Sequence, residues 1–108
     1  METLNFEYRG GTPPAATAAT LTGVVGSGNL EVLVEHAALG GVCRIELTTA
    51  AVGFGHIWQA VLDDFFARHP LADVRVSIND VGATPAVVSL RLDQAVETFL
   101  GTETGDRW

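Results

Sequence analysis

The sequence contains very little cysteine: Cys43 is the only one among 108 residues. A single cysteine excludes an internal disulfide and cannot supply the thiolate pairs of the common zinc sites. A reducing compartment is then the simplest setting, so we expect a cytoplasmic protein. Cys43 falls on the apolar face of a predicted strand, where we expect it to be an unreactive core residue.

Basic residues are also scarce, with six Lys and Arg against thirteen Asp and Glu, which gives a formal net charge of -7. This negative charge would repel phosphate backbones and anionic lipids. We therefore expect neither nucleic acid nor a membrane among the partners. A basic surface on another protein would be attracted instead, with its main effect on the rate of association.

Long apolar runs are missing as well. No stretch approaches the roughly 18 to 20 apolar residues of a membrane-spanning helix, and the start at Met1 lacks the pattern of a secretory signal. Apolar residues nevertheless make up 47% of the chain and charged residues 18%, which is the balance of a globular protein. We expect one domain over residues 1–108, with a hydrophobic core of its own.

Alternating apolar and polar residues predict strands along much of the chain. The predicted strands cover residues 3–8, 21–25, 30–37, 42–48 and 73–80. Residues 10–20 are rich in Gly, Pro, Ala and Thr and have few large apolar side chains to offset the entropy of ordering. They predict a flexible loop within the domain.

Helical spacing of apolar residues predicts two helices. The first lies within residues 53–70 and ends at Pro70, and the second starts at Pro85, with Thr84 as its N-cap and Gly101 at its end. A helix between the last two strands predicts that they pair in parallel, with a right-handed crossover. The expected fold is α+β: a mixed, mostly antiparallel sheet of about four to five strands with two helices on one face.

The segment Gly-Ser-Gly-Asn at residues 26–29 predicts a hairpin between two strands, with Ser27 at its tip. On residue type alone, an ordinary turn serine is the favoured interpretation. The functional alternative is an exposed hydroxyl over which the active site of another protein can close. A hydrolase nucleophile elbow would need glycines where Val25 and Asn29 stand, so self-contained serine catalysis is disfavoured.

Other polar residues give weaker signals. His36, His56 and His69 are far apart in the sequence and do not indicate a metal site. The Gly-Phe-Gly at residues 53–55 lacks the third glycine of a dinucleotide-binding loop. The polar pairs Asp63–Asp64 and Asn79–Asp80 are better explained as solvated residues, the first on a helix face and the second at a turn.

Three segments together resemble the acyl carrier subunit of malonate decarboxylase, also called its delta subunit. They are GVVGSGNLEVLVE, GFGHIWQAVLDDFFARHP and INDVGATPAVVSLRLDQAVETFL, and the likeness runs from Leu4 to about Leu100. The same order of elements more distantly resembles the acyl carrier subunit of citrate lyase. Coverage of this extent is more specific than any single motif.

The resemblance implies that Ser27, between Gly26 and Gly28, is joined through a phosphodiester to a phosphoribosyl-dephospho-CoA group. It also implies a non-catalytic carrier of acetyl and malonyl thioesters. The implied partners are the acyl (malonyl) transferase and decarboxylase subunits, together with a separate transferase that attaches the group. No metal is implied. Asn29 departs from the acidic residue that the family usually has after the second glycine.

Two alternatives remain open at this point. One is a carrier of the citrate lyase type, and the other is a small α+β interaction module whose turn contacts a partner without covalent modification. The two carrier hypotheses require a modified Ser27, whereas the interaction module does not.

Overall fold

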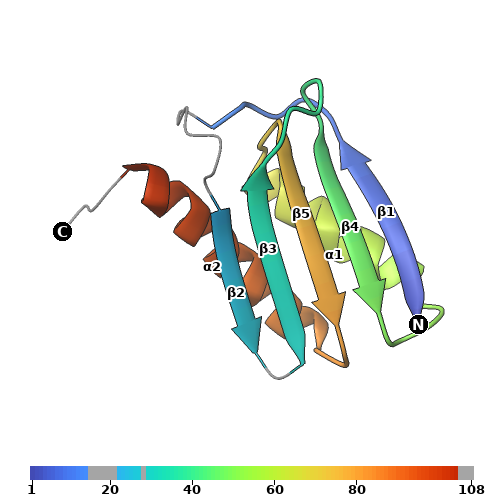
Figure 1. Cartoon of the computed structure of the whole chain (residues 1–108). Coiled ribbons are helices and arrows are strands. Elements are labelled where there is room, and N and C mark those ends of the chain that lie inside the picture. The colour runs from blue at the N-terminus through green and yellow to red at the C-terminus, as the bar shows by residue number, and fades with distance from the viewer. Residues whose placement is uncertain (15–21, 28, 105–108) are drawn as a thin grey trace.

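The computed structural model describes residues 1–14, 22–27 and 29–104; within these ranges the side chains of residues 22–25, 27 and 101–104 are not described. Seven elements follow one another along the described residues (Figure 1). They are β1 (Glu2–Tyr8), β2 (Thr22–Ser27), β3 (Leu30–His36), β4 (Cys43–Thr49), α1 (Gly55–Arg68), β5 (Val74–Asp80) and α2 (Pro85–Thr104).

The five strands form one sheet in the order β1-β4-β5-β3-β2. Three neighbouring pairs are antiparallel, whereas β4 and β5 pair in parallel, with Cys43 opposite Val74 and Thr49 opposite Asp80. Helix α1 makes the connection between these two parallel strands, as the helix-length segment between them predicted. The predicted mixed, mostly antiparallel sheet is confirmed.

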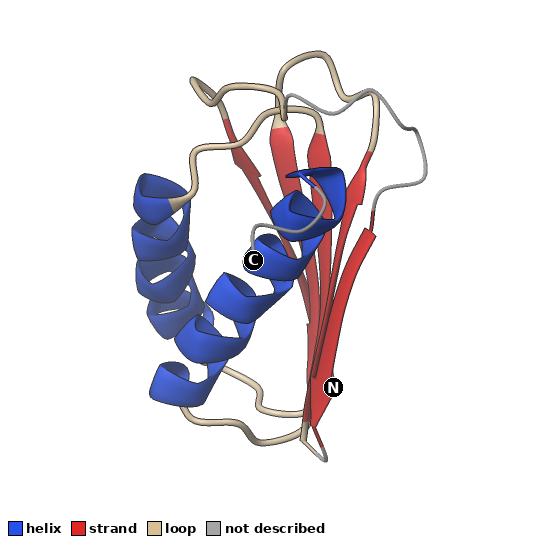
Figure 2. Cartoon of the chain, turned by 90° about the vertical axis from the view of Figure 1, so that its left-hand side faces the viewer, coloured by secondary structure: helices blue, strands red, loops and turns tan. Residues whose placement is uncertain are grey.

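Both helices cover the same face of the sheet, which confirms the predicted layers (Figure 2). Helix α2 packs against β2 and β3 and also contacts α1, which reaches toward β1. The core between the helices and the sheet is apolar because alternate residues of β3, β4 and β5 are buried. Its largest fully buried side chains are Phe65, Phe99, Ile45, Leu47, Leu62, Ile78 and Leu92.

The opposite face of the sheet is polar. Glu7, Arg44, Arg75 and Glu35 occupy one row across four adjacent strands. An ion pair joins each end of the row, Arg44 to Glu7 at 3.0 Å and Arg75 to Glu35 at 3.1 Å. Exposed pairs of this kind contribute little stability, so the row mainly keeps this face hydrated.

The start of α2 agrees with the sequence, and its end does not. The Thr84 hydroxyl accepts a hydrogen bond from the backbone N–H of Val87 at 3.3 Å, the bond expected of an N-cap. The prediction that Gly101 ends the helix is wrong, because α2 continues to Thr104. Glycine is less favourable than alanine in a helix by only about 1 kcal/mol, and the packing of a long helix on the sheet offsets this cost.

Part of the segment predicted as a flexible loop is hydrogen-bonded to the connection between α1 and β5. The N–H of Thr12 donates to the carbonyl of Pro70 at 2.8 Å, and the N–H of Ala72 donates to the carbonyl of Thr12 at 3.0 Å. Gly11 allows this close approach, because a Cβ there would lie 2.7 Å from the Leu71 backbone. Residues 15–20 of the predicted loop lie outside the described residues.

Among the described residues, no helix is long and apolar enough to cross a membrane.

Candidate functional site

The hairpin that carries Ser27 joins the edge strand β2 to β3. Its backbone register pairs Ser27 with Leu30 and Gly26 with Glu31. Strand β2 therefore extends two residues beyond the predicted strand, and Ser27 is its last residue rather than the tip of a four-residue turn. A two-residue loop is sufficient here because Gly-Asn is a common hairpin connection. Gly28 and the Ser27 side chain lie outside the description.

Gly26 is exposed, and a Cβ placed there would meet no atom within 4 Å. Its φ lies outside the positive range that favours glycine. The fold therefore does not require glycine at this position. A side chain at Gly26 would occupy open space on the exposed face of the sheet, on the same side as Glu31.

Three chain segments meet at the end of the sheet where this hairpin lies (the lower end in Figure 1). Strand β3 begins there, and β4 and β5 end there, because β5 runs antiparallel to β3 and parallel to β4. Both helices also begin at this end, since each follows directly on one of those strands. We call this part of the molecule, formed by residues 26–30, 49–55 and 80–85, the hairpin end.

Asp80 holds the hairpin end together. Its side chain is only 3% exposed, and its Oδ2 accepts a hydrogen bond from the Thr49 hydroxyl at 2.8 Å. Its Oδ1 accepts the backbone N–H groups of Gly82 at 3.3 Å and Ala83 at 2.9 Å. Its backbone carbonyl accepts the N–H of Ala50 at 2.9 Å. One residue thereby fixes both loops that lead into the helices.

The hairpin is joined to the same cluster through its own backbone. The N–H of Val81 donates to the carbonyl of Asn29 at 2.9 Å, and Leu30 pairs with Asp80 in the sheet. On the β4 side, the Thr49 hydroxyl accepts the N–H of Ala51 at 3.1 Å. The position of Ser27 relative to the helices thus depends on bonds that converge on Asp80 and its neighbours.

The sequence prediction for Asp80 is wrong. Asn79 is exposed, as expected for a turn, but Asp80 is buried rather than solvated. The signal was present in the alternation of β5, because Asp80 occupies the same face as Val74, Val76 and Ile78. An acidic residue at a core position followed by Gly82 indicates a side chain that bonds the following turn.

The three histidines are not brought together at the hairpin end. His56 is exposed near the start of α1, and His36 ends β3 at the opposite end of the sheet. His69 caps α1, also at the opposite end. Among the described residues, no group of three or more His, Cys, Asp or Glu side chains is placed to hold a metal ion.

The remaining predicted site residues have structural contacts. Asp63 accepts hydrogen bonds from the Tyr8 hydroxyl and from Gln59, both at 2.7 Å. These bonds lower the pKa of Asp63, whereas burial, followed by the bond to Asp63, raises the pKa of Tyr8. Cys43 is 1% exposed, and burial raises the pKa of its thiol to about 11, so it is protonated and unreactive at neutral pH.

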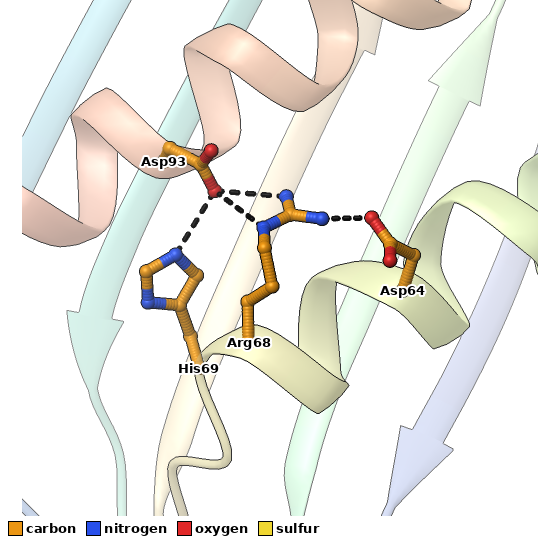
Figure 3. A network of polar contacts seen from close by, with 4 residues as sticks. All are labelled: Asp64, Arg68, His69 and Asp93. Carbon is orange, nitrogen blue, oxygen red and sulfur yellow. Dashed lines mark hydrogen bonds and ion pairs between the residues drawn. The ribbon is translucent and has the colours of Figure 1, made fainter.

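A second polar cluster joins the two helices far from the hairpin end (Figure 3). Asp93 of α2 accepts the Arg68 Nη2 at 2.8 Å and contacts the His69 Nε2 at 2.9 Å, and Arg68 also pairs with Asp64 one turn earlier. Burial alone would raise the pKa of Asp93, but the bonds from Arg68 and His69 lower it below its ordinary value. No serine or threonine hydroxyl and no cysteine thiol takes part in the contacts drawn, so the cluster joins the two helices and is not a catalytic triad.

The comparisons with known proteins connect the hairpin end to a family. The family model described as malonate decarboxylase delta subunit (MdcD) matches residues 17–99, which include the whole hairpin and both helix starts. The chain belongs to the malonate decarboxylase delta-subunit family. This finding confirms the resemblance that the sequence indicated.

Relatives that match this chain over nearly their whole length are named malonate decarboxylase acyl carrier proteins. A malonate decarboxylase acyl carrier protein of Stenotrophomonas maltophilia (strain R551-3) is 62% identical over 105 residues, which covers 96% of this chain and 99% of the relative. One of Xanthomonas euvesicatoria pv. vesicatoria (strain 85-10) is 64% identical over 104 residues, with 95% and 99% coverage. The delta-subunit family is therefore a family of acyl carrier proteins of malonate decarboxylase.

A solved structure has a similar fold. A chain in the crystal structure of a Pseudomonas malonate decarboxylase hetero-tetramer in complex with malonate is 38% identical to this chain, with a TM-score of 0.76. The match covers 92% of this chain and 99% of that chain. The delta-subunit fold described above is thus also found in a chain of a multi-subunit malonate decarboxylase.

We predict that Asp80→Ala lowers the free energy of unfolding by about 3 kcal/mol, because it leaves the Thr49 hydroxyl and two backbone N–H groups without their acceptor. Asp80→Asn keeps one acceptor oxygen and should cost less. Urea unfolding measures both values, with the exposed neighbour variant Asn79→Ala as control. Equal losses for Asp80→Ala and Asn79→Ala would contradict the role assigned to Asp80.

We predict that Asp93→Asn lowers the free energy of unfolding by about 0.5–1 kcal/mol at neutral pH, since the cluster is partly solvent-exposed. The pKa of Asp93 is lowered on folding from 3.8, so its contribution is present above that pH and is lost as the pH falls through the folded-state pKa. The difference between wild type and variant should therefore shrink in acid. Unfolding curves between pH 7 and the acid limit test this, with exposed Glu97→Gln on the same helix as control.

Proposed function

We propose that this chain is the acyl carrier subunit of a malonate decarboxylase and that Ser27 carries its prosthetic group, phosphoribosyl-dephospho-CoA, through a phosphodiester. The observation that supports this most directly is the family match, which extends across the hairpin and both helix starts. Ser27 ends the edge strand β2, beside a two-residue loop. A residue in that place can be approached by a second protein from outside the sheet.

The residues of the hairpin end fit a large anionic group. Gly26 is exposed and leaves open space where a side chain would otherwise stand. Both helix N-termini lie at the hairpin end, and neither helix has an acidic residue in its first turn. No side chain there neutralises the partial positive charge of the N-termini. A phosphodiester at Ser27 would meet no acidic side chain from those two turns. The covalent bond at the serine oxygen would attach the group to the chain.

In the loading reaction the chain supplies the nucleophile, the Ser27 hydroxyl, and the scaffold that positions it. A serine hydroxyl attacks well only after a base removes its proton, and the sequence neighbours Gly26, Gly28 and Asn29 cannot act as bases. The base is therefore assigned to the transferase that attaches the group. The pairing of Leu30 with Asp80 and the bond from Val81 to Asn29 connect the hairpin to the loop before α2, so these contacts support it while the transferase acts.

When attached, the group would supply a thiol on which acetyl and malonyl units are carried as thioesters. The chain is assigned no catalytic step: it presents its cargo to acyl transferase and decarboxylase subunits. A tether raises the concentration of the cargo at each active site, so that intermediates need not diffuse away. The solved relative from a hetero-tetramer supports an assembly with other subunits.

We predict that co-expression with the transferase adds one prosthetic group per chain and that Ser27→Ala abolishes the addition. Intact-mass measurement shows the added mass, and a fragment spectrum locates it. Ser77→Ala and Ser89→Ala are matched controls, because they remove the other two serines and should load normally. An unmodified wild-type chain, or loading that survives Ser27→Ala, would overturn the assignment.

Thiol counting gives an independent measurement, because Cys43 is buried and has a raised pKa. The native unloaded chain should show no thiol that reacts rapidly with a thiol reagent, and the native loaded chain should show one. In denaturant the counts should rise to one and two, since Cys43 is the only cysteine. A loaded chain with no rapidly reacting thiol would contradict a free thiol at the end of the group.

A further inference from the structure

The hairpin end contains a cavity of about 200 Å³ whose lining does not include Ser27. It is formed by the end of β5, the loops before the two helices and the first two turns of those helices. Its lining consists of Ala51, Phe54, Ile57, Trp58, Val61, Asp80, Ala83, Pro85 and Val88. Eight of these nine side chains are apolar, so the cavity favours an uncharged occupant.

The one acidic residue of the lining has its hydrogen-bonding capacity largely used. Both carboxylate oxygens of Asp80 already accept bonds, one from Thr49 and the other from the N–H groups of Gly82 and Ala83. Asp80 would also repel a carboxylate that entered the cavity. A nucleotide base or a free malonyl carboxylate would therefore find few partners there, whereas a small neutral acyl group needs almost none.

The size of the cavity limits which ligands can occupy it. A dry apolar cavity of about 150 Å³ is large enough to hold benzene, whereas drug-sized ligands occupy roughly 300 to 1,000 Å³. At about 200 Å³ this cavity would take one end of a long molecule and not the whole of it. An acetyl thioester, with a methyl group, a carbonyl and a sulfur, is of that size.

Exposed apolar side chains also occur in the two loops that contribute to the lining. Val52 is 64% exposed, Phe54 46% and Val81 62%, and all three belong to the two loops that Asp80 fixes. Clustered exposed apolar side chains usually mark a binding site, whereas single ones need no explanation. Phe54 belongs both to this surface and to the lining, so it stands where an occupant would enter.

The cavity is within reach of the attachment residue. Ser27 pairs with Leu30 and Leu30 pairs with Asp80, so the Ser27 backbone lies two strand spacings from a residue of the lining. Two spacings amount to roughly 10 Å. A group with a pantetheine arm is longer than this and can fold back across the hairpin end.

We propose that this cavity binds the neutral acyl thioester at the free end of the group that Ser27 carries. The inference rests on the proposed function for the identity of the tethered group, but the preference of the cavity for a small neutral thioester rests on its lining alone. Tethering gives an effective concentration in the mM range, so an affinity of about 1 mM would already fill the cavity about half of the time. The acetyl thioester would then occupy the cavity of the free carrier and would leave it when a partner subunit binds the carrier.

The first experiment separates the cavity from attachment. The Ser27→Ala chain cannot be loaded at position 27, and S-acetyl-N-acetylcysteamine serves as the probe in a two-dimensional amide NMR titration. We expect saturable shifts of the Trp58 indole and of the Ala83 amide, with a dissociation constant in the mM range. The absence of any saturable shift at these positions up to 20 mM probe would overturn the proposal.

Cavity-filling variants supply the matched comparison. Ala83→Leu and Ala51→Leu each place three extra carbons in the lining, and each should weaken probe binding at least tenfold. Leu90→Ala removes an exposed apolar side chain from α2 outside the lining and should leave binding unchanged. The amide spectrum of each variant shows whether it is folded. Equal affinity in the folded filling variants would contradict binding in the cavity.

The second experiment uses the loaded chain with a carbon-13 label in the acetyl methyl group. Nuclear Overhauser contacts from this methyl to Trp58 and Val88 are expected, and Ala83→Leu should remove them. If intact mass shows the group on Ser27 and these contacts are absent, the cavity proposal fails while the proposed function stands. If mass shows no group at Ser27, the proposed function fails, and the titration of the Ser27→Ala chain still decides whether the cavity binds a thioester.

Discussion

The arrangement of the hairpin end depends on one buried carboxylate. Asp80 receives a hydroxyl from β4 and two N–H groups from the loop before α2, and its strand neighbour Leu30 belongs to the hairpin. A buried carboxylate is costly unless it is hydrogen-bonded, so each of these contacts offsets part of the cost of burying Asp80. The start of β3, the loop before α1 and the loop before α2 are therefore all joined through Asp80 and its neighbour Val81.

Most of the fold follows from patterns that can be read in the sequence. Period-two alternation placed β1, β3, β4 and β5, and helical spacing placed α1 and α2, because each element buries one face against the other layer. The crossover length also predicted the parallel β4–β5 pair. The full strand order could not be predicted, since β3 pairs with β5 only through contacts between distant segments. The end of α2 was missed because packing on the sheet outweighs the propensity of Gly101.

The candidate site was only partly accessible to the same reasoning. Residue type alone favoured an ordinary turn at Ser27, and the resemblance, not the spacing of glycines, pointed to attachment. Asp80 was misread because acidic residues near turns are usually solvated, although the alternation of β5 placed it on the buried face. The cavity beside it was not foreseen at all, because its lining comes from two separate stretches of the chain, 51–61 and 80–88, that only the folded state brings together.

The two ends of this molecule face different constraints. The Asp93 cluster ties the helices together near the end of α1, and the connections around Gly40 and Thr12 lie at that end too. None of these residues bonds to Asp80 or to the hairpin among the contacts described. A change in those loops would therefore reach the Ser27 hairpin only through the length of the strands, whereas a change at Asp80 would act directly on the contacts next to it.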